Sequence, residues 1–260
     1  MFIDQYRSAC SATAGSLCVG LDPHLDRMPP EFGGTPEGVE RFLDRVIERT
    51  IDHASAYKPN IAFFEVLGAE GFGVLARTIE RIRQANRPVI LDAKRGDIAS
   101  TAAAYAEAAF GKLKADAITV VAYMGSDAVR PFLERGGFAF VLALPSNPSA
   151  EAIVDHGDPP LFERVAEMAL KLETTYPGQV GLVVGATRPH EAGRLHRVAP
   201  DLPWLVPGIG AQGASSAAFF AEAGEHQVLA INASRAILFA PDPGKAAEEL
   251  CNTIEELRNV

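Results

Sequence analysis

The chain has 260 residues, of which 48% are apolar and 22% are charged, and its formal net charge is −9. This balance is typical of a globular protein with a large core, and the acidic charge argues against nucleic acid or an anionic membrane as a partner. No apolar run approaches the roughly 18 residues that span a bilayer. The start of the chain lacks a basic segment followed by an apolar one, and Cys10, Cys18 and Cys251 form no Cys-x-x-Cys pair. We therefore expect a cytoplasmic protein in a reducing compartment.

Short apolar runs alternate with amphipathic helical runs along the whole chain, a pattern typical of βα units around a parallel sheet. Between the first two runs, Thr35 and Pro36 supply the N-cap and first-turn proline of a helix. The predicted strands are residues 16–21, 56–62, a third beginning at Val89, 117–121, 138–144, 181–184, 204–206 and 227–231. The sequence thus predicts an α/β fold, a single (β/α)8 TIM barrel domain over residues 1–260.

Asp92 and Lys94 lie at the end of the third predicted strand. Because side chains alternate along a strand, the two residues share one face, which places a carboxylate beside an ammonium group. Gly96 and Asp97 then lead into an Ala-rich helix, residues 100–110. Such a pair serves as a structural salt bridge in many proteins, so its place in the fold decides the interpretation.

In a (β/α)8 barrel, chemistry takes place at the carboxyl ends of the strands. Polar residues lie at the ends of several predicted strands and therefore meet at this one rim. They are Asp22, Lys58, Asp92, Lys94, Ser146, Gln212, Ser234 and Arg235. A random surface would scatter such groups over both rims, so this gathering favours a functional site.

Residues 208–213 spell G-x-G-x-x-G between a strand and a helix. Too few residues follow for the second half of a dinucleotide-binding fold, so we interpret the segment as a glycine turn whose backbone N–H groups face a phosphate. Arg235, opening the helix after the last strand, is expected to clamp the same phosphate. A plain turn and a surface arginine are the structural alternative.

Other motifs are less informative. His190 and His196 lie on different faces of a helix, so no zinc site is expected. Ser146 and Thr101 have no adjacent histidine base, which argues against nucleophilic hydrolysis. Residues 144–160 form a long loop rich in Pro, Ser and Asp, either a lid or a disordered tip.

Four segments together resemble orotidine 5'-phosphate decarboxylases, in their longer bacterial subgroup. They are YKPNIAFFE at 57–65, LDAKRGDI at 91–98 with Thr101, PGIGAQG at 207–213, and ASRAI at 233–237. The Asp-x-Lys-x-x-Asp element is shared with sugar-phosphate relatives of the same barrel. Lys58 is the sharper mark, because the metal-dependent relatives are expected to carry an acidic metal ligand on that strand.

The resemblance implies a lyase that removes CO2 from orotidine monophosphate to give uridine monophosphate in de novo pyrimidine biosynthesis, with no metal and no organic cofactor. Lys94 would donate a proton to C6 of the pyrimidine, and Asp92 would lie against the departing carboxylate. Lys58 and Asp97 would complete an alternating array of charges. The resemblance also implies a homodimer in which Asp97, Ile98 and Thr101 reach the partner's site.

The substrate-binding residues implied by the resemblance surround this array. Asp22 would bind a ribose hydroxyl, Ser146 the pyrimidine edge, and Gln212 with Arg235 the phosphate. The rest of the set is Ile98, Thr101, Pro207 and Ser234. Two other functions fit the same barrel: a sugar-phosphate decarboxylase or aldolase with Mg2+ at Asp92, and a non-catalytic phosphate-binding barrel such as a nucleotide sensor.

Overall fold

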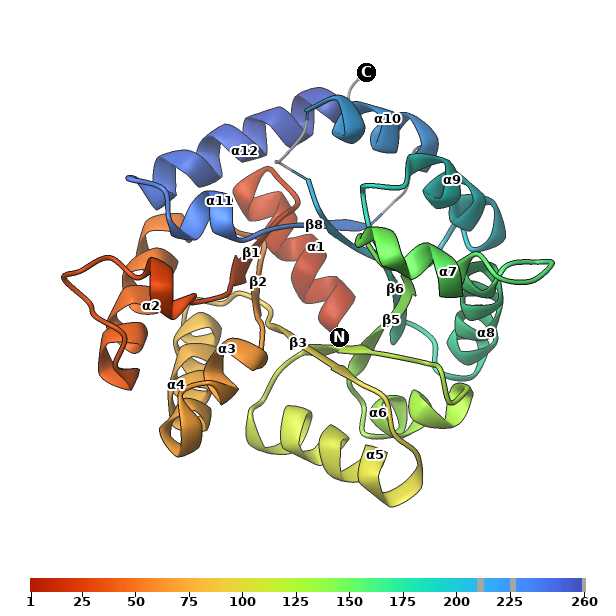
Figure 1. Ribbon diagram of the computed structural model, residues 1–260, viewed down its shortest axis with the longest axis horizontal. Helices are drawn as coiled ribbons and strands as arrows, with labels where there is room; N and C mark the ends of the chain where they lie inside the picture. Colours follow the sequence, from red (N-terminus) through yellow and green to blue (C-terminus); the bar gives the residue numbers. More distant parts are fainter. Residues whose placement is uncertain (210–212, 225–227, 259–260) are drawn as a thin grey trace.

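Eight parallel strands form one sheet in the order β2-β1-β8-β7-β6-β5-β4-β3 in the computed structural model, which describes residues 1–209, 213–224 and 228–258. The strands are β1 Leu17–Leu21, β2 Ala56–Pro59, β3 Ile90–Arg95, β4 Ala117–Val120, β5 Phe138–Leu144, β6 Val180–Val184, β7 Trp204–Pro207 and β8 Leu229–Ala233. Parallel bridges from Tyr57 to Val89 and from Asn60 to Asp92 join the two ends of this order. The sheet therefore curls into a barrel, and the predicted (β/α)8 fold is confirmed (Figure 1).

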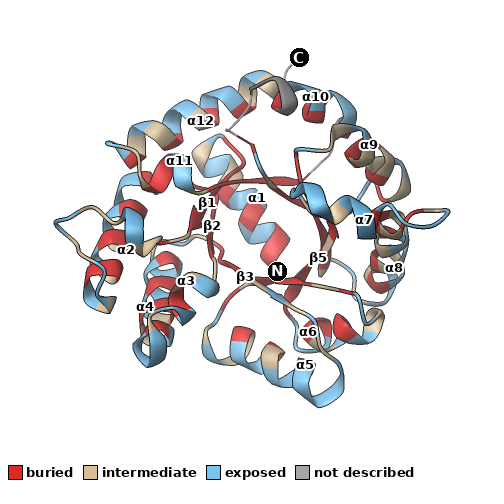
Figure 2. Cartoon of the chain, in the orientation of Figure 1, coloured by how far each residue is buried: buried red, intermediate tan, exposed pale blue. Residues whose placement is uncertain are grey.

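Helices surround the barrel and turn their apolar faces towards the strands (Figure 2). They are α1 Phe2–Thr13, α2 Pro36–Thr50, α3 Ala62–Glu65, α4 Gly71–Gln84, α5 Ala99–Ala106, α6 Arg130–Glu134, α7 Glu151–Val154, α8 Leu161–Thr175, α9 Pro189–Val198, α10 Gly213–Ala223, α11 Arg235–Leu238 and α12 Pro243–Arg258. Thr35 caps α2 as predicted, since its side chain accepts a hydrogen bond from the Gly38 N–H. Among the described residues, no helix is long and apolar enough to cross a membrane.

Helix α1 closes the amino-terminal end of the barrel and crosses the middle of the ring of strands (Figure 1). The Phe2 ring packs against Phe138 and Phe140, with ring centres 4.9 and 5.6 Å apart. The Tyr6 hydroxyl lies 3.0 Å from the Ser16 carbonyl oxygen and 2.9 Å from that of Leu229. Burial raises the pKa of this phenol well above its usual value, so Tyr6 stays a hydrogen-bond donor. The sequence did not predict this floor.

Some predicted boundaries were wrong. The second strand ends at Pro59 rather than at residue 62, because the Asn60 side chain accepts a hydrogen bond from the Ala62 N–H and the chain turns into α3. The eighth strand begins at Leu229, and Gln227 lies outside the described residues. The predicted helix 100–110 continues past α5 as a π-helix over residues 107–112.

Candidate active site

Three charged side chains meet at the carboxyl ends of β2 and β3. The Lys58 Nζ atom lies 2.7 Å from Asp92 Oδ2, and the Lys94 Nζ atom lies 2.6 Å from Asp92 Oδ1. The side chains of Lys58 and Asp92 are only 5% and 9% exposed, whereas that of Lys94 is 47% exposed. The carboxylate is therefore held between a buried ammonium group and one that faces the rim.

The buried pair sets its own charge states. Burial alone would raise the pKa of the Asp92 carboxyl, but the ammonium groups of Lys58 and Lys94 hold that pKa well below its usual range. Burial alone would lower the pKa of Lys58, but the carboxylates of Asp92 and Asp22 raise it above its usual value. Both groups are thus ionised at neutral pH.

Regular strand alternation does not explain how Lys94 reaches Asp92. The residues do share one side of β3, as predicted, but the ladder between β3 and β4 shifts register between Leu91 and Arg95. Within the shift, Lys94 has a left-handed backbone with φ of 44°. This conformation costs a non-glycine residue roughly 1–2 kcal/mol, so neighbouring contacts must hold it.

A residue absent from the sequence-based set lies at the centre of this irregularity. The hydroxyl of Thr119, on β4, lies 2.9 Å from Asp92 Oδ1 and 3.0 Å from the Lys94 N–H nitrogen. Thr119 lies between Ile118 and Val120 in an apolar run, where a threonine is an ordinary strand former. Only the position of that strand beside Asp92 would have indicated it.

The segment after β3 points away from this cluster. The Asp97 carboxylate accepts a hydrogen bond from the Ile98 N–H at 2.8 Å, and in the described part of the chain it makes no ion pair with Lys94. Ile98 is 48% exposed, and Thr101, in the first turn of α5, is also exposed. A single chain therefore brings together three of the four predicted charges.

Polar atoms gather between β1 and β8, beside Lys58. Asp22 Oδ1, Asn232 Oδ1 and Ser234 Oγ are buried and have no hydrogen-bond partner in the described part of the protein. Gly20 is needed for this close packing, because a Cβ atom on residue 20 would lie only 2.8 Å from Ser234 Cβ and 3.2 Å from Asn232 Oδ1. Asn232 was not among the predicted site residues, although a lone amide in an apolar strand was a usable signal.

The remaining predicted residues lie on the same rim. Ser146 follows β5 and is exposed, Pro207 ends β7, and Arg235 is exposed at the start of α11. Gly185 allows the Ser146 loop to approach β6, since a Cβ atom there would lie 2.9 Å from Ser146 Cα. Gln212 lies outside the described residues.

Residues 144–160 contain more structure than the predicted loop. They include a short 3-10 turn and α7, and Arg188 anchors them from the segment before α9. The Arg188 Nη2 atom lies 2.7 Å from Asp155 Oδ2 and 2.8 Å from Glu191 Oε1. The segment is thus tied down at its far end, while Ser146 stays at the rim.

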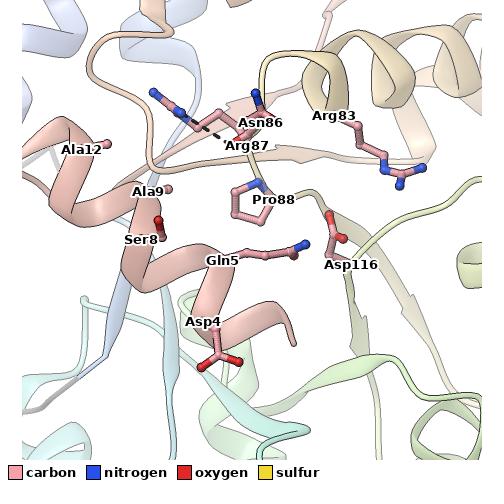
Figure 3. Close-up of a pocket in the computed structure, with 10 residues that line it drawn as sticks. All are labelled: Asp4, Gln5, Ser8, Ala9, Ala12, Arg83, Asn86, Arg87, Pro88 and Asp116. Atoms are coloured by element: carbon pink, nitrogen blue, oxygen red, sulfur yellow. Dashed lines mark hydrogen bonds between the residues drawn. The ribbon is translucent and has the colours of Figure 1, made fainter.

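A cavity of about 610 Å3 lies at the opposite end of the barrel, between α1 and the entry to β3 (Figure 3). Two of its polar side chains, Asp116 and Arg87, stabilise the fold. The Asp116 carboxylate accepts the Val89 N–H at 2.8 Å, and the Arg87 guanidinium donates to the Ala54 and Ile51 carbonyl oxygens at 2.8 and 3.0 Å. Because these two groups are already paired, the carboxyl rim is the better candidate for an active site.

No group of three or more His, Cys, Asp or Glu side chains among the described residues is arranged to hold a metal ion. At Asp92, both carboxylate oxygens already contact ammonium groups. A divalent cation would have to displace one of them.

Comparisons with known proteins agree with this geometry. Residues 15–250 match the family described as Orotidine 5'-phosphate decarboxylase / HUMPS family. The chain belongs to this family. This membership confirms the resemblance drawn from the four segments. It also confirms the predicted class of enzyme, a decarboxylase.

Individual members of the family are similar over nearly the whole chain. Orotidine 5'-phosphate decarboxylase of Herpetosiphon aurantiacus is 44% identical over 253 residues, covering 95% of this chain and 93% of the relative. That of Thermomicrobium roseum is 45% identical over 258 residues, covering 93% and 90%. The structure of Leishmania donovani OMP decarboxylase has a TM-score of 0.88 at 42% identity, covering 100% of this chain and 99% of the other.

Proposed function

We propose that the protein converts orotidine 5'-monophosphate to uridine 5'-monophosphate and CO2 without a metal or an organic cofactor. The observation that carries this proposal is the Asp92 carboxylate held ionised between Lys58 and Lys94 at the rim. In the reaction the C6–carboxylate bond breaks, its electron pair stays on C6, and a proton from Lys94 then bonds to C6.

In this scheme, electrostatic interactions lower the barrier to loss of CO2. The carbanion at C6 is localised, because no ring carbonyl delocalises it well, so the site must offer opposite charge and a proton. At about 4 Å, the attraction between unit charges is of order 4 kcal/mol at an effective dielectric constant of 20. Asp92 would repel the substrate carboxylate by a similar amount, and this repulsion ends as CO2 leaves.

The rim offers contacts for the rest of the nucleotide. Asp22 would bind a ribose hydroxyl through its unpaired Oδ1, Ser146 the pyrimidine edge, and Arg235 with Gln212 the phosphate. Pro207 and Ser234 would line the space between base and phosphate. Binding free energy from the distant phosphate can align the pyrimidine ring and order the segment at 144–160.

Lys58 is the argument against the sugar-phosphate alternative. Its buried ammonium group lies 2.7 Å from Asp92 Oδ2, on the strand where a metal-dependent relative needs an acidic ligand. A fixed positive charge there opposes a second cation at the same carboxylate. The nucleotide-sensor alternative leaves the array with no task, since a phosphate sensor does not require a caged carboxylate.

The active site is completed, in our proposal, by a second copy of the chain. Asp97, Ile98 and Thr101 would reach the partner's site and set Asp97 against the exposed side of Lys94. Exposed apolar side chains on the loops after β3 and β4 support such a contact, since Ile98, Tyr123 and Met124 are 48%, 84% and 54% exposed.

Residues 1–260 would act as one barrel domain in each subunit of this homodimer. Cys10, Cys18 and Cys251 are all free thiols, which supports a reducing, cytoplasmic location.

The test is the ultraviolet absorbance of orotidine monophosphate mixed with the purified protein in excess EDTA. We expect the spectrum to change to that of uridine monophosphate, and the Lys94→Ala variant to leave it unchanged. A folded wild-type protein without turnover would refute the proposal and direct attention to phosphosugars with Mg2+. Turnover that requires Mg2+ would refute the metal-free scheme.

A further inference from the structure

We infer that Thr119 is a positioning residue for this decarboxylation: its hydroxyl fixes both the Asp92 carboxylate and the backbone that aims Lys94. The inference rests on the proposed function. Thr119 would not touch the substrate; it would act through the two residues that do.

The register of β3 against β4 isolates this residue. Leu91 pairs with Ile118, and the next pair is Arg95 with Val120. Three residues of β3, from Asp92 to Lys94, therefore lie opposite the single residue Thr119. In a regular parallel ladder, alternate residues of β3 would bond to carbonyl oxygens of β4, and the bulge interrupts this pattern.

The Thr119 hydroxyl bonds to two consecutive N–H groups within this interruption. Its Oγ1 atom accepts hydrogen bonds from the Ala93 and Lys94 N–H groups at 3.1 and 3.0 Å. A hydroxyl has two acceptor positions and one hydrogen, so these bonds use both acceptor positions. The hydrogen is then left for Asp92 Oδ1, at 2.9 Å. Every hydrogen-bonding position of the hydroxyl is committed to this segment of β3.

These hydrogen bonds hold two groups that take part in the proposed reaction, the Asp92 carboxylate and Lys94. The bond to Asp92 Oδ1 holds the carboxylate plane while Lys58 holds the other oxygen. The bond from the Lys94 N–H holds that residue in its left-handed conformation. Because Thr119 is only 1% exposed, water does not readily replace the hydroxyl in a variant.

The experiment compares Thr119→Val, which keeps the shape and loses the hydroxyl, with Thr119→Ser, which keeps the hydroxyl. The control is Thr78→Val, since Thr78 is also buried but donates to the Val74 carbonyl oxygen within α4. Each variant is assayed for turnover of orotidine monophosphate, for the dissociation constant of uridine monophosphate, and for thermal unfolding. If Thr119→Val does not fold, Thr119→Ala takes its place.

We expect Thr119→Val to lower kcat about 10- to 100-fold, which is about 1.4 to 2.7 kcal/mol at 1.36 kcal/mol per tenfold. Product affinity should change less than about threefold, because its contacts come from other strands. Thr119→Ser should restore kcat to within about threefold of wild type, and Thr78→Val should leave it unchanged.

Three results would overturn the inference: unchanged kcat in Thr119→Val, a serine variant as slow as the valine variant, or losses in kcat and product affinity of equal size. Wild-type turnover in the same assay separates the two proposals. A wild-type protein without turnover refutes the proposed function, and this inference with it. Normal wild-type turnover with an unaffected Thr119→Val refutes the role of Thr119 alone.

Discussion

Lys94 donates a 2.6 Å hydrogen bond to Asp92 Oδ1 although its side chain is 47% exposed, whereas Lys58 binds the other oxygen of the same carboxylate from a buried position. The two ammonium groups therefore have different tasks. Lys58 stays inside the barrel and balances Asp92, while Lys94 has access to a substrate at the rim. In the proposed mechanism, the proton donor is the accessible Lys94.

Lys94→Ala is expected to abolish turnover almost completely, by at least about 10⁴-fold, since in the proposed mechanism it removes both the proton donor and the charge that stabilises the carbanion. Affinity for uridine monophosphate should change much less. The measurements are turnover by ultraviolet absorbance and product binding by calorimetry. Lys171→Ala, on the outer helix α8, is the matched control and should behave as wild type. Ordinary turnover in Lys94→Ala would remove Lys94 from the mechanism.

Mixing inactive chains tests whether the active site is shared between subunits. Lys94→Ala and Asp97→Ala homodimers should each be nearly inactive. In a heterodimer, one of the two sites receives both mutations and the other receives neither, so about a quarter of wild-type activity is expected after equal, random exchange. Subunit exchange is followed independently with a fluorescent label on one chain. Complete exchange with no recovered activity would mean that Asp97 serves its own subunit.

Asp92→Asn is expected to destabilise the protein at pH 7 by about 3–5 kcal/mol, because it leaves the buried Lys58 without its carboxylate. The pKa of Asp92 is lowered in the folded state, mainly by Lys58 and Lys94 against the opposing effect of burial. Its contribution is therefore present above the unfolded pKa of about 3.9 and is lost as pH falls through the lower folded value.

Urea unfolding between pH 7 and pH 3.5 checks this dependence. The gap in unfolding free energy between wild type and Asp92→Asn should narrow below about pH 4. Glu40→Gln is the control, since Glu40 pairs with the exposed Arg77, and its effect should stay within about 1 kcal/mol. A gap that stays constant over the whole range would show that Asp92 is not held ionised by its neighbours.

Tyr6→Phe is expected to lower stability by about 1–2 kcal/mol without changing turnover, because the hydroxyl that binds the Ser16 and Leu229 carbonyl oxygens is lost at the floor of the barrel. Thermal and urea unfolding measure the loss. Tyr176→Phe removes an exposed hydroxyl that lies 3.4 Å from Glu134 and should have almost no effect. A fall in turnover for Tyr6→Phe would mean that the floor and the rim are coupled.

The fold was predictable because its signal is repeated along the chain. Each strand is a short apolar run and each long helix has an apolar stripe, so an error at one boundary does not change the architecture. The burial of a single residue is harder to predict than the fold. Phe72 fits the apolar stripe of α4 but is 48% exposed, because the buried stripe passes through Val74 and Leu75. The floor helix α1 was missed because its apolar face gives no sign of what it covers.

The candidate site also has a part that the sequence predicts and a part that it does not. The clustering of Lys58, Asp92 and Lys94 was predictable because charged residues at the ends of apolar strands are unusual. Thr119 was not, since its role depends on which strands are neighbours and on a register shift, whereas the lone amide of Asn232 in an apolar strand was a signal that went unused. Spacing along one strand cannot reveal a bulge that is stabilised from the next strand.

The two ends of the barrel differ in how their polar atoms are paired. At the floor, Tyr6 and Asp116 both have protein partners. At the rim, buried oxygen atoms of Asp22, Asn232 and Ser234 have none in the described part of the chain, and each such atom costs about 1–3 kcal/mol. A nucleotide bound as proposed would supply partners for these atoms and so stabilise the fold as well as fill the site. Under the proposed function, tight substrate binding and high stability of the ligand-free protein would therefore place opposite demands on these three side chains.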